Sequence, residues 1–143
     1  MRARYRWYCE RTPPTLAAYG DRWCQAESVS WGGVKAQVYM YYTHDSLMNA
    51  TANFPESDFG EVLKALFIKY GEPTETSQST VRNGMGAEFT NETALWATAS
   101  SYVVAKRYVN KISESSVDYY LKSWLPATQQ RQAERAANSA KKL

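Results

Sequence analysis

The chain lacks most of the residue types from which catalytic and metal sites are built. Its 143 residues include one histidine, His44, and two cysteines, Cys9 and Cys24. Because a structural zinc site takes four ligands, these three side chains do not supply one. No serine stands in a G-x-S-x-G context, and any catalytic triad would have to recruit the same His44, which lies beside Asp45 in a polar turn. We therefore expect no catalytic residues, no metal and no cofactor.

Long apolar runs are also absent. No segment approaches the roughly 20 apolar residues that cross a bilayer as a helix. The first residues, MRARYRWYCE, carry arginines with no apolar stretch after them, so the sequence shows no signal peptide. We expect no transmembrane segment in this chain.

Aromatic residues, in contrast, are abundant. Eleven Tyr and five Trp contribute to an aromatic content of 14%, whereas only 22% of the residues are charged. This composition favours a strand-rich protein over a helical bundle or a disordered chain. With 44% apolar residues, the chain is long enough for one domain with a core. We expect a single domain over residues 1–127, with 1–8 as a flexible arm and 128–143 as a C-terminal helix or tail.

The net charge of +3 is unevenly distributed along the chain. Residues 1–11 and residues 131–143 each carry four basic residues and one acidic residue, whereas residues 12–130 hold nine basic and twelve acidic residues. A nucleic-acid-binding domain concentrates positive charge on its structured face. The charge distribution therefore disfavours nucleic acid as the partner, although the basic ends keep it as an alternative.

The clearest local pattern lies in the segment SDFGEVLKALFIKYG, residues 57–71. Apolar side chains recur there at steps of three and four, which predicts an amphipathic helix. Asp58 and Glu61 have the spacing of a capping box, with Ser57 as the competing cap. Gly71 suits the residue after a helix, and Pro73 prevents continuation. The stripe is too apolar to face water, so we expect a sheet to cover it. Its members are Phe59, Val62, Leu63, Leu66, Phe67 and Tyr70.

Strand patterns surround this helix. The segment 34–43 alternates, and a polar turn at 44–46 leads into a second alternating segment, 47–54, in which we expect Leu47 to point outward. Further strands are expected at 22–30, 88–98, 102–110 and 116–124. The polar segment 72–86 is expected to be a loop that is either mobile or functional. In the 34–43 strand the inward residues are Val34, Ala36, Val38, Met40 and Tyr42, and the outward residues are Lys35, Gln37, Tyr39 and Tyr41.

These elements predict a fold class. Their order is (β)ββαβββα, and the short connections favour antiparallel neighbours. We expect an α+β two-layer sandwich in which one amphipathic helix, 57–71, packs on one face of an antiparallel sheet of four to six strands.

The two cysteines leave two interpretations open. A disulfide between Cys9 and Cys24 would close a loop of about 15 residues and stabilise the fold by up to about 3 kcal/mol. Such a local bridge suits an oxidising compartment and would indicate a periplasmic or exported protein. Two reduced, buried thiols would instead indicate the cytoplasm.

Two further patterns do not point to catalysis. Glu88 and Glu92 lie four residues apart on an expected strand, so their positions are about 13 Å apart, beyond the usual spacing of glycosidase carboxylates. The segment Arg82–Gly86 contains G-x-G but lacks the third glycine and the strand–turn–helix context of a dinucleotide site. We interpret that segment as a flexible loop.

Several of these features occur together in one known group of proteins. A cysteine pair, a Gly-Gly, a strand hairpin, the helix pattern F-x-x-V-x-x-A-L-x-x-K-Y-G-x-P and a late SSVDY stretch are similar to those of small, largely uncharacterised proteobacterial proteins, often exported and sometimes prophage-borne. The resemblance covers roughly residues 9–143. It implies an α+β fold and an exported protein, and it implies no reaction. This chain differs from that group at its start, where no export signal is visible.

The outward face of the 34–43 strand is the candidate binding surface. Tyrosines on a weakly charged sheet make good protein interfaces, because Tyr brings contact area at low entropy cost. The alternative is that residues 1–31 cover this face inside the fold with their Trp residues. The four candidate interface residues are Lys35, Gln37, Tyr39 and Tyr41.

We therefore predict a non-enzymatic protein-binding or accessory module of inhibitor, immunity or envelope-accessory type. It would use this tyrosine-rich face or an unpaired strand edge, and the same edge would allow a homodimer. The alternatives are a nucleic-acid accessory protein that uses the basic termini, and an enzyme whose site only the folded chain assembles.

Overall fold

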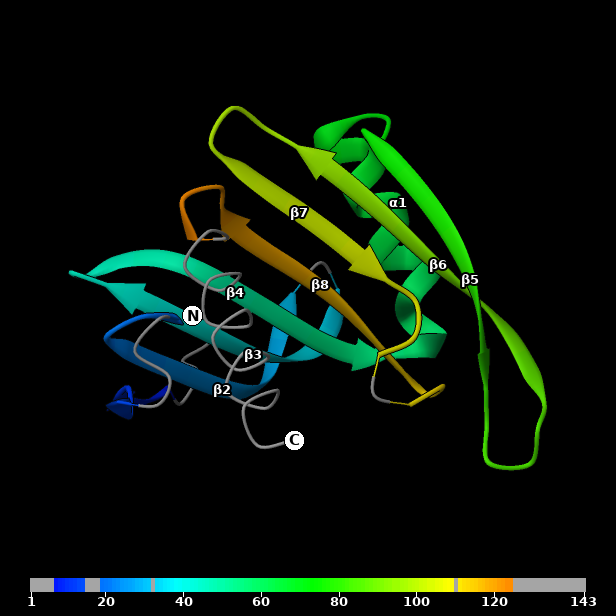
Figure 1. The fold of residues 1–143 in the computed structure, drawn as a ribbon, viewed down its shortest axis with the longest axis horizontal. Coiled ribbons are helices and arrows are strands. Elements are labelled where there is room, and N and C mark those ends of the chain that lie inside the picture. Colours follow the sequence, from blue (N-terminus) through cyan, green and yellow to red (C-terminus); the bar gives the residue numbers. More distant parts are fainter. Residues whose placement is uncertain (1–6, 15–18, 32, 110, 125–143) are drawn as a thin grey trace, which may run out of the picture.

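A computed structural model of the chain describes residues 7–14, 19–31, 33–109 and 111–124. These residues form one open antiparallel sheet of eight strands and one α-helix (Figure 1). The strand order across the sheet is β1-β2-β3-β4-β8-β7-β6-β5. The elements are β1 Tyr8–Arg11, β2 Arg22–Trp31, β3 Val34–Thr43, β4 Ser46–Pro55, α1 Phe59–Tyr70, β5 Glu75–Arg82, β6 Glu88–Ala97, β7 Ser101–Lys106 and β8 Glu114–Leu121.

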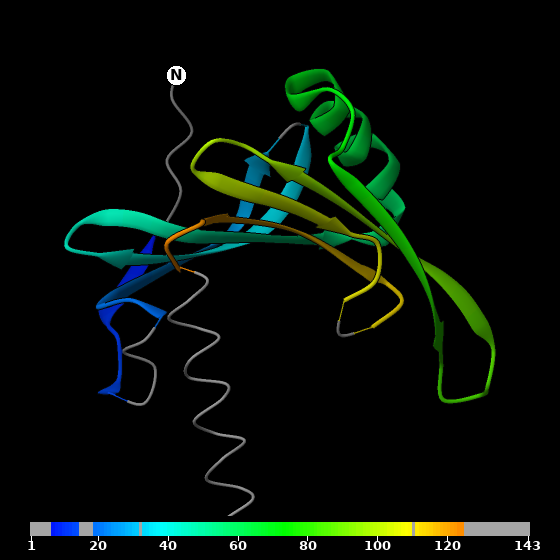
Figure 2. The same cartoon turned by 45° about the horizontal axis from the view of Figure 1, so that its top comes forward.

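The sheet consists of two four-stranded meanders. Strands β1 to β4 pair in chain order, and so do β5 to β8. The last strands of the two meanders, β4 and β8, pair antiparallel and join them into one sheet. Helix α1 connects β4 to β5, so it crosses from the middle of the sheet to its far edge. It lies on one side of the sheet, which we call the helix side (Figure 2).

The expected α+β class with an antiparallel sheet and one covering helix is confirmed, but the expected four to six strands are wrong. Two strands were missed, β1 and β5. Strand β5 lies inside the segment 72–86 that we expected to be a loop, and its sequence ETSQSTVR is exposed almost throughout. Because β5 is an edge strand with no buried face, backbone pairing with β6 holds it, and such pairing leaves no apolar alternation in the sequence. The expected C-terminal helix, 128–143, lies outside the described residues.

Helix α1 forms where its apolar stripe predicts. Phe59, Val62 and Leu66 are buried against the sheet. The helix ends at Gly71, whose φ is 82° and whose N–H donates to the carbonyl oxygen of Phe67 at 2.8 Å. A positive φ at this position suits glycine, as the sequence predicts. The sheet side of this core consists mainly of Ala36, Ala52, Phe54, Ala94, Trp96, Val103, Ala105 and Val117.

The predicted capping box at the start of α1 is wrong. Asp58 is the N-cap residue, but its side chain makes no capping hydrogen bond. A short 3-10 turn, Glu56–Asp58, precedes the helix and already places Asp58 in helical backbone geometry, with φ −95° and ψ −1°. A capping side chain reaches the first free N–H groups from an extended backbone, and this residue does not have one.

The β3–β4 hairpin turns at His44 and Asp45, which have φ values of 49° and 64°. The register then shifts, because Tyr41 pairs with Asn49 whereas Tyr42 pairs with Leu47. One extra residue in β4 produces this bulge and changes which side the strand presents. Leu47 therefore lies on the helix side, and the expectation that it points outward is wrong.

Candidate functional site

The two cysteines form a disulfide that attaches β1 to the sheet. Cys9 and Cys24 lie directly opposite each other in the β1–β2 register, with their Cα atoms 4.1 Å apart. The predicted pairing is confirmed, and it is compatible with an oxidising compartment. Among the described residues, no helix combines the length and the apolar character needed to cross a bilayer. A periplasmic or exported location stays a prediction.

The side of the sheet opposite α1, which we call the open side, carries a continuous line of aromatic rings. In the strand register, Asn49 pairs with Tyr41 on one neighbouring strand and with Tyr120 on the other, and Tyr120 pairs in turn with Tyr102. All three tyrosines therefore lie on the open side. Two rings from outside the strands complete the line. Successive centroid distances are 6.0 Å for Tyr41–Tyr19, 5.9 Å for Tyr19–Trp124, 5.8 Å for Trp124–Tyr120 and 5.5 Å for Tyr120–Tyr102. We call these five residues the aromatic row.

Backbone contacts hold the first part of the row in place. The indole Nε1–H of Trp124 donates to the carbonyl oxygen of Tyr19 at 2.8 Å. The N–H of Asp21 donates to the carbonyl oxygen of Tyr42 at 2.8 Å, which fixes the segment before β2 against β3. Desolvation, followed by the neighbouring Tyr19, raises the pKa of Tyr41 above its ordinary value of 10.0. The ring of Tyr41 is thus partly buried, in contact with the ring of Tyr19.

The four candidate interface residues therefore separate into two groups. All lie on the open side of β3, as alternation predicts, but Tyr41 belongs to the aromatic row. Lys35 is exposed, and Gln37 and Tyr39 are partly exposed. The side-chain amide of Gln37 donates to Glu27 at 3.2 Å.

The alternative of internal cover is thus only partly right. Tyr19 does cover Tyr41, but the second covering ring, Trp124, comes from the other end of the described chain. Of the three Trp residues expected to cover this face, Trp31 packs on the helix side against Phe54 and Trp7 is exposed. Trp23 lies opposite Tyr41 in the β2–β3 register and packs against Tyr8.

A shallow hollow of about 260 Å³ borders the unburied part of this face. Gln37 and Asn53 line it from the sheet, and Lys111 and Glu114 line it from the β7–β8 connection and β8. Next to it, the hydroxyl of Thr51 donates to Asp118 at 2.6 Å. This surface therefore combines one tyrosine with amide, hydroxyl and charged groups of both signs.

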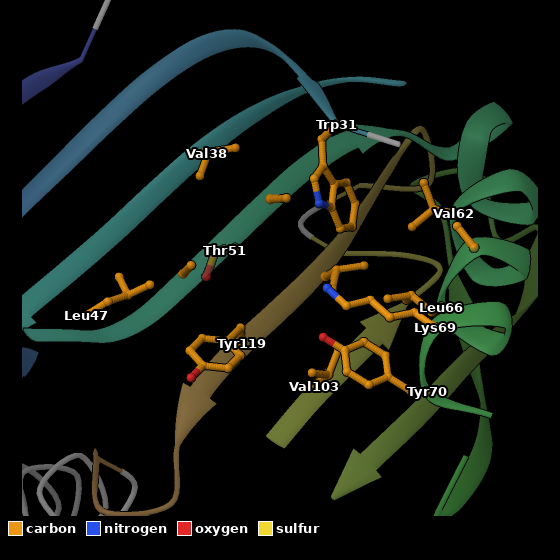
Figure 3. Close-up of a pocket in the computed structure, with 14 residues that line it drawn as sticks. Trp31, Val38, Leu47, Thr51, Val62, Leu66, Lys69, Tyr70, Val103 and Tyr119 are labelled. Carbon is orange, nitrogen blue, oxygen red and sulfur yellow. The ribbon is translucent and has the colours of Figure 1, made fainter. Parts of the chain in front are cut away.

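The helix side contains a larger cavity, of about 520 Å³, between α1 and the strands (Figure 3). Strand residues form its floor, α1 forms one wall, and Trp31 stands at the end of β2. The side chains of Lys69 and Tyr70 reach from α1 towards the strands (Figure 3). We call it the apolar cavity. Its lining consists chiefly of Trp31, Val38, Leu47, Ala50, Ala52, Val62, Ala65, Leu66, Lys69, Tyr70, Val103, Val117 and Tyr119.

Sequence reasoning missed the apolar cavity. Its lining comes from β2, β3, β4, α1, β7 and β8, and no local pattern brings these together. The only signal in the sequence is the run of small residues in β4, Ala50 and Ala52, which leaves space beneath the helix. A second hollow of about 550 Å³ on the other flank of α1 is lined partly by polar groups, including Gln78 and Glu92.

The candidate catalytic groups are spread apart. His44 is exposed in the β3–β4 turn, where its N–H donates to Asp21 at 2.9 Å, and it lines none of the three hollows described above. Glu88 pairs with Arg82 at 2.6 Å. Within the part of the chain that the structure describes, no three His, Cys, Asp or Glu side chains gather as metal ligands.

Arg107 joins two carboxylates that lie far apart in the sequence. It pairs with Glu56 at 2.9 Å and with Glu92 at 3.3 Å. The hydrogen bond that Arg107 donates to Glu56 raises the pKa of Arg107 above its ordinary value, so the guanidinium stays charged. This cluster connects the turn before α1 to β6 and to the end of β7. Glu92, considered above as one of two possible catalytic carboxylates, therefore has a structural role in this ion pair.

The basic termini, on which the nucleic-acid alternative depends, lie mostly outside the described residues. That alternative stays a prediction. Comparison of the chain with models of protein families, with curated proteins and with solved structures gives no match. The resemblance to small proteobacterial proteins therefore also stays a prediction, and function has to be argued from the two sides of the sheet.

Proposed function

We propose that the chain is a non-enzymatic protein-binding module and that its binding surface is the open side of β3 and β4. The observation that carries this proposal is the position of Tyr39, which is partly exposed on this side, in β3 between Gln37 and the aromatic row. A partly exposed tyrosine supplies contact area and a hydroxyl, and its two side-chain torsions lose little entropy on binding.

The surroundings of Tyr39 favour a protein as the partner. On the same side, Asn53 and Asp118 supply an amide and an anion from β4 and β8, and Lys35 supplies a cation further along β3. This combination matches the mixed polar rim of a protein interface. The hollow beside Gln37 has the volume to take a side chain of the partner. Tyr39 lies in a strand that is paired on both edges, so ordering this surface on binding costs little backbone entropy.

The test is affinity capture with cross-linking, using the wild-type chain and two variants as baits. Tyr39→Asp changes the proposed surface, and Ile68→Asp is the matched control because Ile68 is 79% exposed on α1. We expect one protein to be retained by the wild type and by Ile68→Asp and to be lost with Tyr39→Asp. Retention by all three baits, or a monomeric mass in extract with no captured protein, contradicts the proposal.

The edge of β5 favours a second mode of protein binding. The N–H of Asn83 donates to Ala87 across the β5–β6 turn. Because antiparallel strands alternate, odd-numbered residues of β5 then face β6, and Thr76, Gln78 and Thr80 direct their backbone groups to the free edge. Such an edge accepts a strand from a partner or from a second copy of the chain.

Gln78→Pro tests this mode, because it removes an N–H from the free edge without removing a bond to β6. Gln78→Ala is the matched control. If the edge is used, the proline variant loses the captured partner, or loses the dimer by light scattering, and the alanine variant keeps it. Equal partner capture and equal mass for the two variants would exclude the β5 edge as a binding site.

A further inference from the structure

We propose that the apolar cavity binds a single-chain amphiphile with an anionic headgroup, its chain on the strands and its headgroup beside Lys69. This inference does not depend on the proposed protein-binding surface, because the two lie on opposite sides of the sheet. Nothing in the pattern of the sequence alone assigns a ligand to this region.

The size and lining of the cavity suit an apolar chain. A volume of about 520 Å³ lies within the range of small-molecule sites. In-register rows of the helix side form the floor, with Ala52 between Val38 and Val117. The floor crosses β3, β4, β8 and β7, a width of roughly 14 Å at ordinary strand spacing. Methylene groups laid across this floor contact aliphatic side chains throughout.

The charge at the cavity selects the headgroup. Among the described residues that line the cavity, Lys69 is the one charged residue and none is a carboxylate. Its Nζ lies 5.3 Å from the ring centre of Tyr70, so a cation and a phenol hydroxyl are together at the end of α1. The partial negative charge at this helix end opposes an anion, but it is only about half of the full charge on Lys69. An anionic head is therefore favoured over a neutral or cationic one.

The second hollow on the other flank of α1 supports this choice by contrast. Glu92 lines it, and so do polar side chains of β5, including Ser77 and Gln78. Glu92 is already paired with Arg107, and no lysine or arginine is among the described residues that line this hollow. Nothing in that lining attracts an anion, and the polar groups offer less apolar contact to a chain. The two flanks of one helix therefore differ in ligand preference, and only the apolar cavity combines an aliphatic floor with an unopposed cation.

Calorimetric titration of the purified chain with monomeric laurate, decanoate, dodecanol and a lysophosphatidylglycerol tests the proposal. We expect laurate to bind at least tenfold more tightly than dodecanol, and affinity to rise about fourfold for each added methylene. Binding of laurate alone indicates a fatty-acid site, and binding of the lysolipid alone indicates a lysolipid site. Binding of both indicates that the cavity recognises the chemistry they share, an apolar chain with an anionic headgroup. Binding of neither amphiphile, or equal binding of laurate and dodecanol, overturns the proposal.

Three variants locate the site. Lys69→Gln is expected to weaken laurate about tenfold and to leave dodecanol unchanged, whereas Lys64→Gln, an exposed lysine of α1 outside the lining, is expected to change neither. Ala65→Trp fills the cavity from an exposed helix position and is expected to weaken both ligands. Circular dichroism checks that each variant is folded. Unchanged binding by Ala65→Trp, or an equal loss in the two lysine variants, overturns the proposal.

Discussion

The two sides of the sheet differ in chemistry although the same strands form both: the helix side is apolar, and the open side is aromatic and polar. In β3 and β4, the residues on the helix side are mainly apolar, including Val38, Ala52 and Phe54, whereas those on the open side are mainly Tyr, Gln, Asn and Thr. The helix side is closed by one long element that buries an apolar ridge and leaves the apolar cavity beside it. On the open side, the described residues that pack over the sheet in the aromatic row are Tyr19 and Trp124.

This difference indicates how stability and recognition are divided. On the helix side, apolar burial against α1 supplies the main stabilising contact. The apolar cavity is the space between the helix and the strands that α1 leaves unfilled. On the open side, aromatic contacts and hydrogen bonds hold Tyr19 and Trp124 against the sheet, and polar groups beside them stay accessible. A substitution on the helix side should therefore change stability most, and one on the open side should change recognition more than stability.

The largest expected effect comes from the ridge of α1. Phe59→Ala should lower the free energy of unfolding by about 3–5 kcal/mol, because Phe59 is buried between α1 and the sheet. Ile68→Ala, on the exposed side of the same helix, should change it by less than about 0.5 kcal/mol. Urea unfolding followed by circular dichroism measures both. Similar effects at the two positions would show that this ridge is not the main attachment of the helix.

A smaller effect is expected on the open side, at the segment that carries Tyr19. Gly20 has a φ of 153°, and a Cβ at this position would lie 2.6 Å from the carbonyl oxygen of Tyr42. Gly20→Ala should therefore destabilise the fold by about 1–3 kcal/mol. In contrast, Gly60→Ala in α1 meets no atom within 4 Å and should stabilise the helix by up to about 1 kcal/mol.

Thermal unfolding of the two glycine variants gives the comparison directly. Opposite signs of the change in melting temperature are expected. A Gly20→Ala variant as stable as the wild type would mean that the segment before β2 shifts freely, and that the aromatic row is not fixed by it.

The sequence predicts well those elements whose signal is local. The helix was predicted from its three-and-four spacing and from Gly71, because both depend on contacts within a few turns. The β3–β4 hairpin was predicted because each strand has one buried side. Strand β5 was missed because neither of its sides is buried in the core, and the side of Leu47 was missed because a bulge is a one-residue feature without a sequence marker.

The candidate sites were less predictable, because they depend on residues that only the folded chain brings together. Tyr39 and Gln37 were identified from alternation along one strand. The partners of Tyr41 were not, since Tyr19 and Trp124 lie 105 residues apart. In the sequence, Lys69 is an ordinary lysine in the last turn of a helix. No local pattern indicates that β3, β4 and β8 leave a cavity beside it.

The smallest expected effect is a loss of stability at alkaline pH that belongs to the open side. Desolvation raises the pKa of Tyr41 and of Tyr120 above the ordinary value of 10.0. Because the folded state holds these two protons more tightly than the unfolded state, their contribution is complete below pH 10 and is lost as pH rises above it. Unfolding free energies measured from about pH 8 to 11 should therefore fall, and fall less steeply for the Tyr41→Phe/Tyr120→Phe variant. Identical slopes for the variant and the wild type would show that these two hydroxyls ionise as freely in the aromatic row as in water.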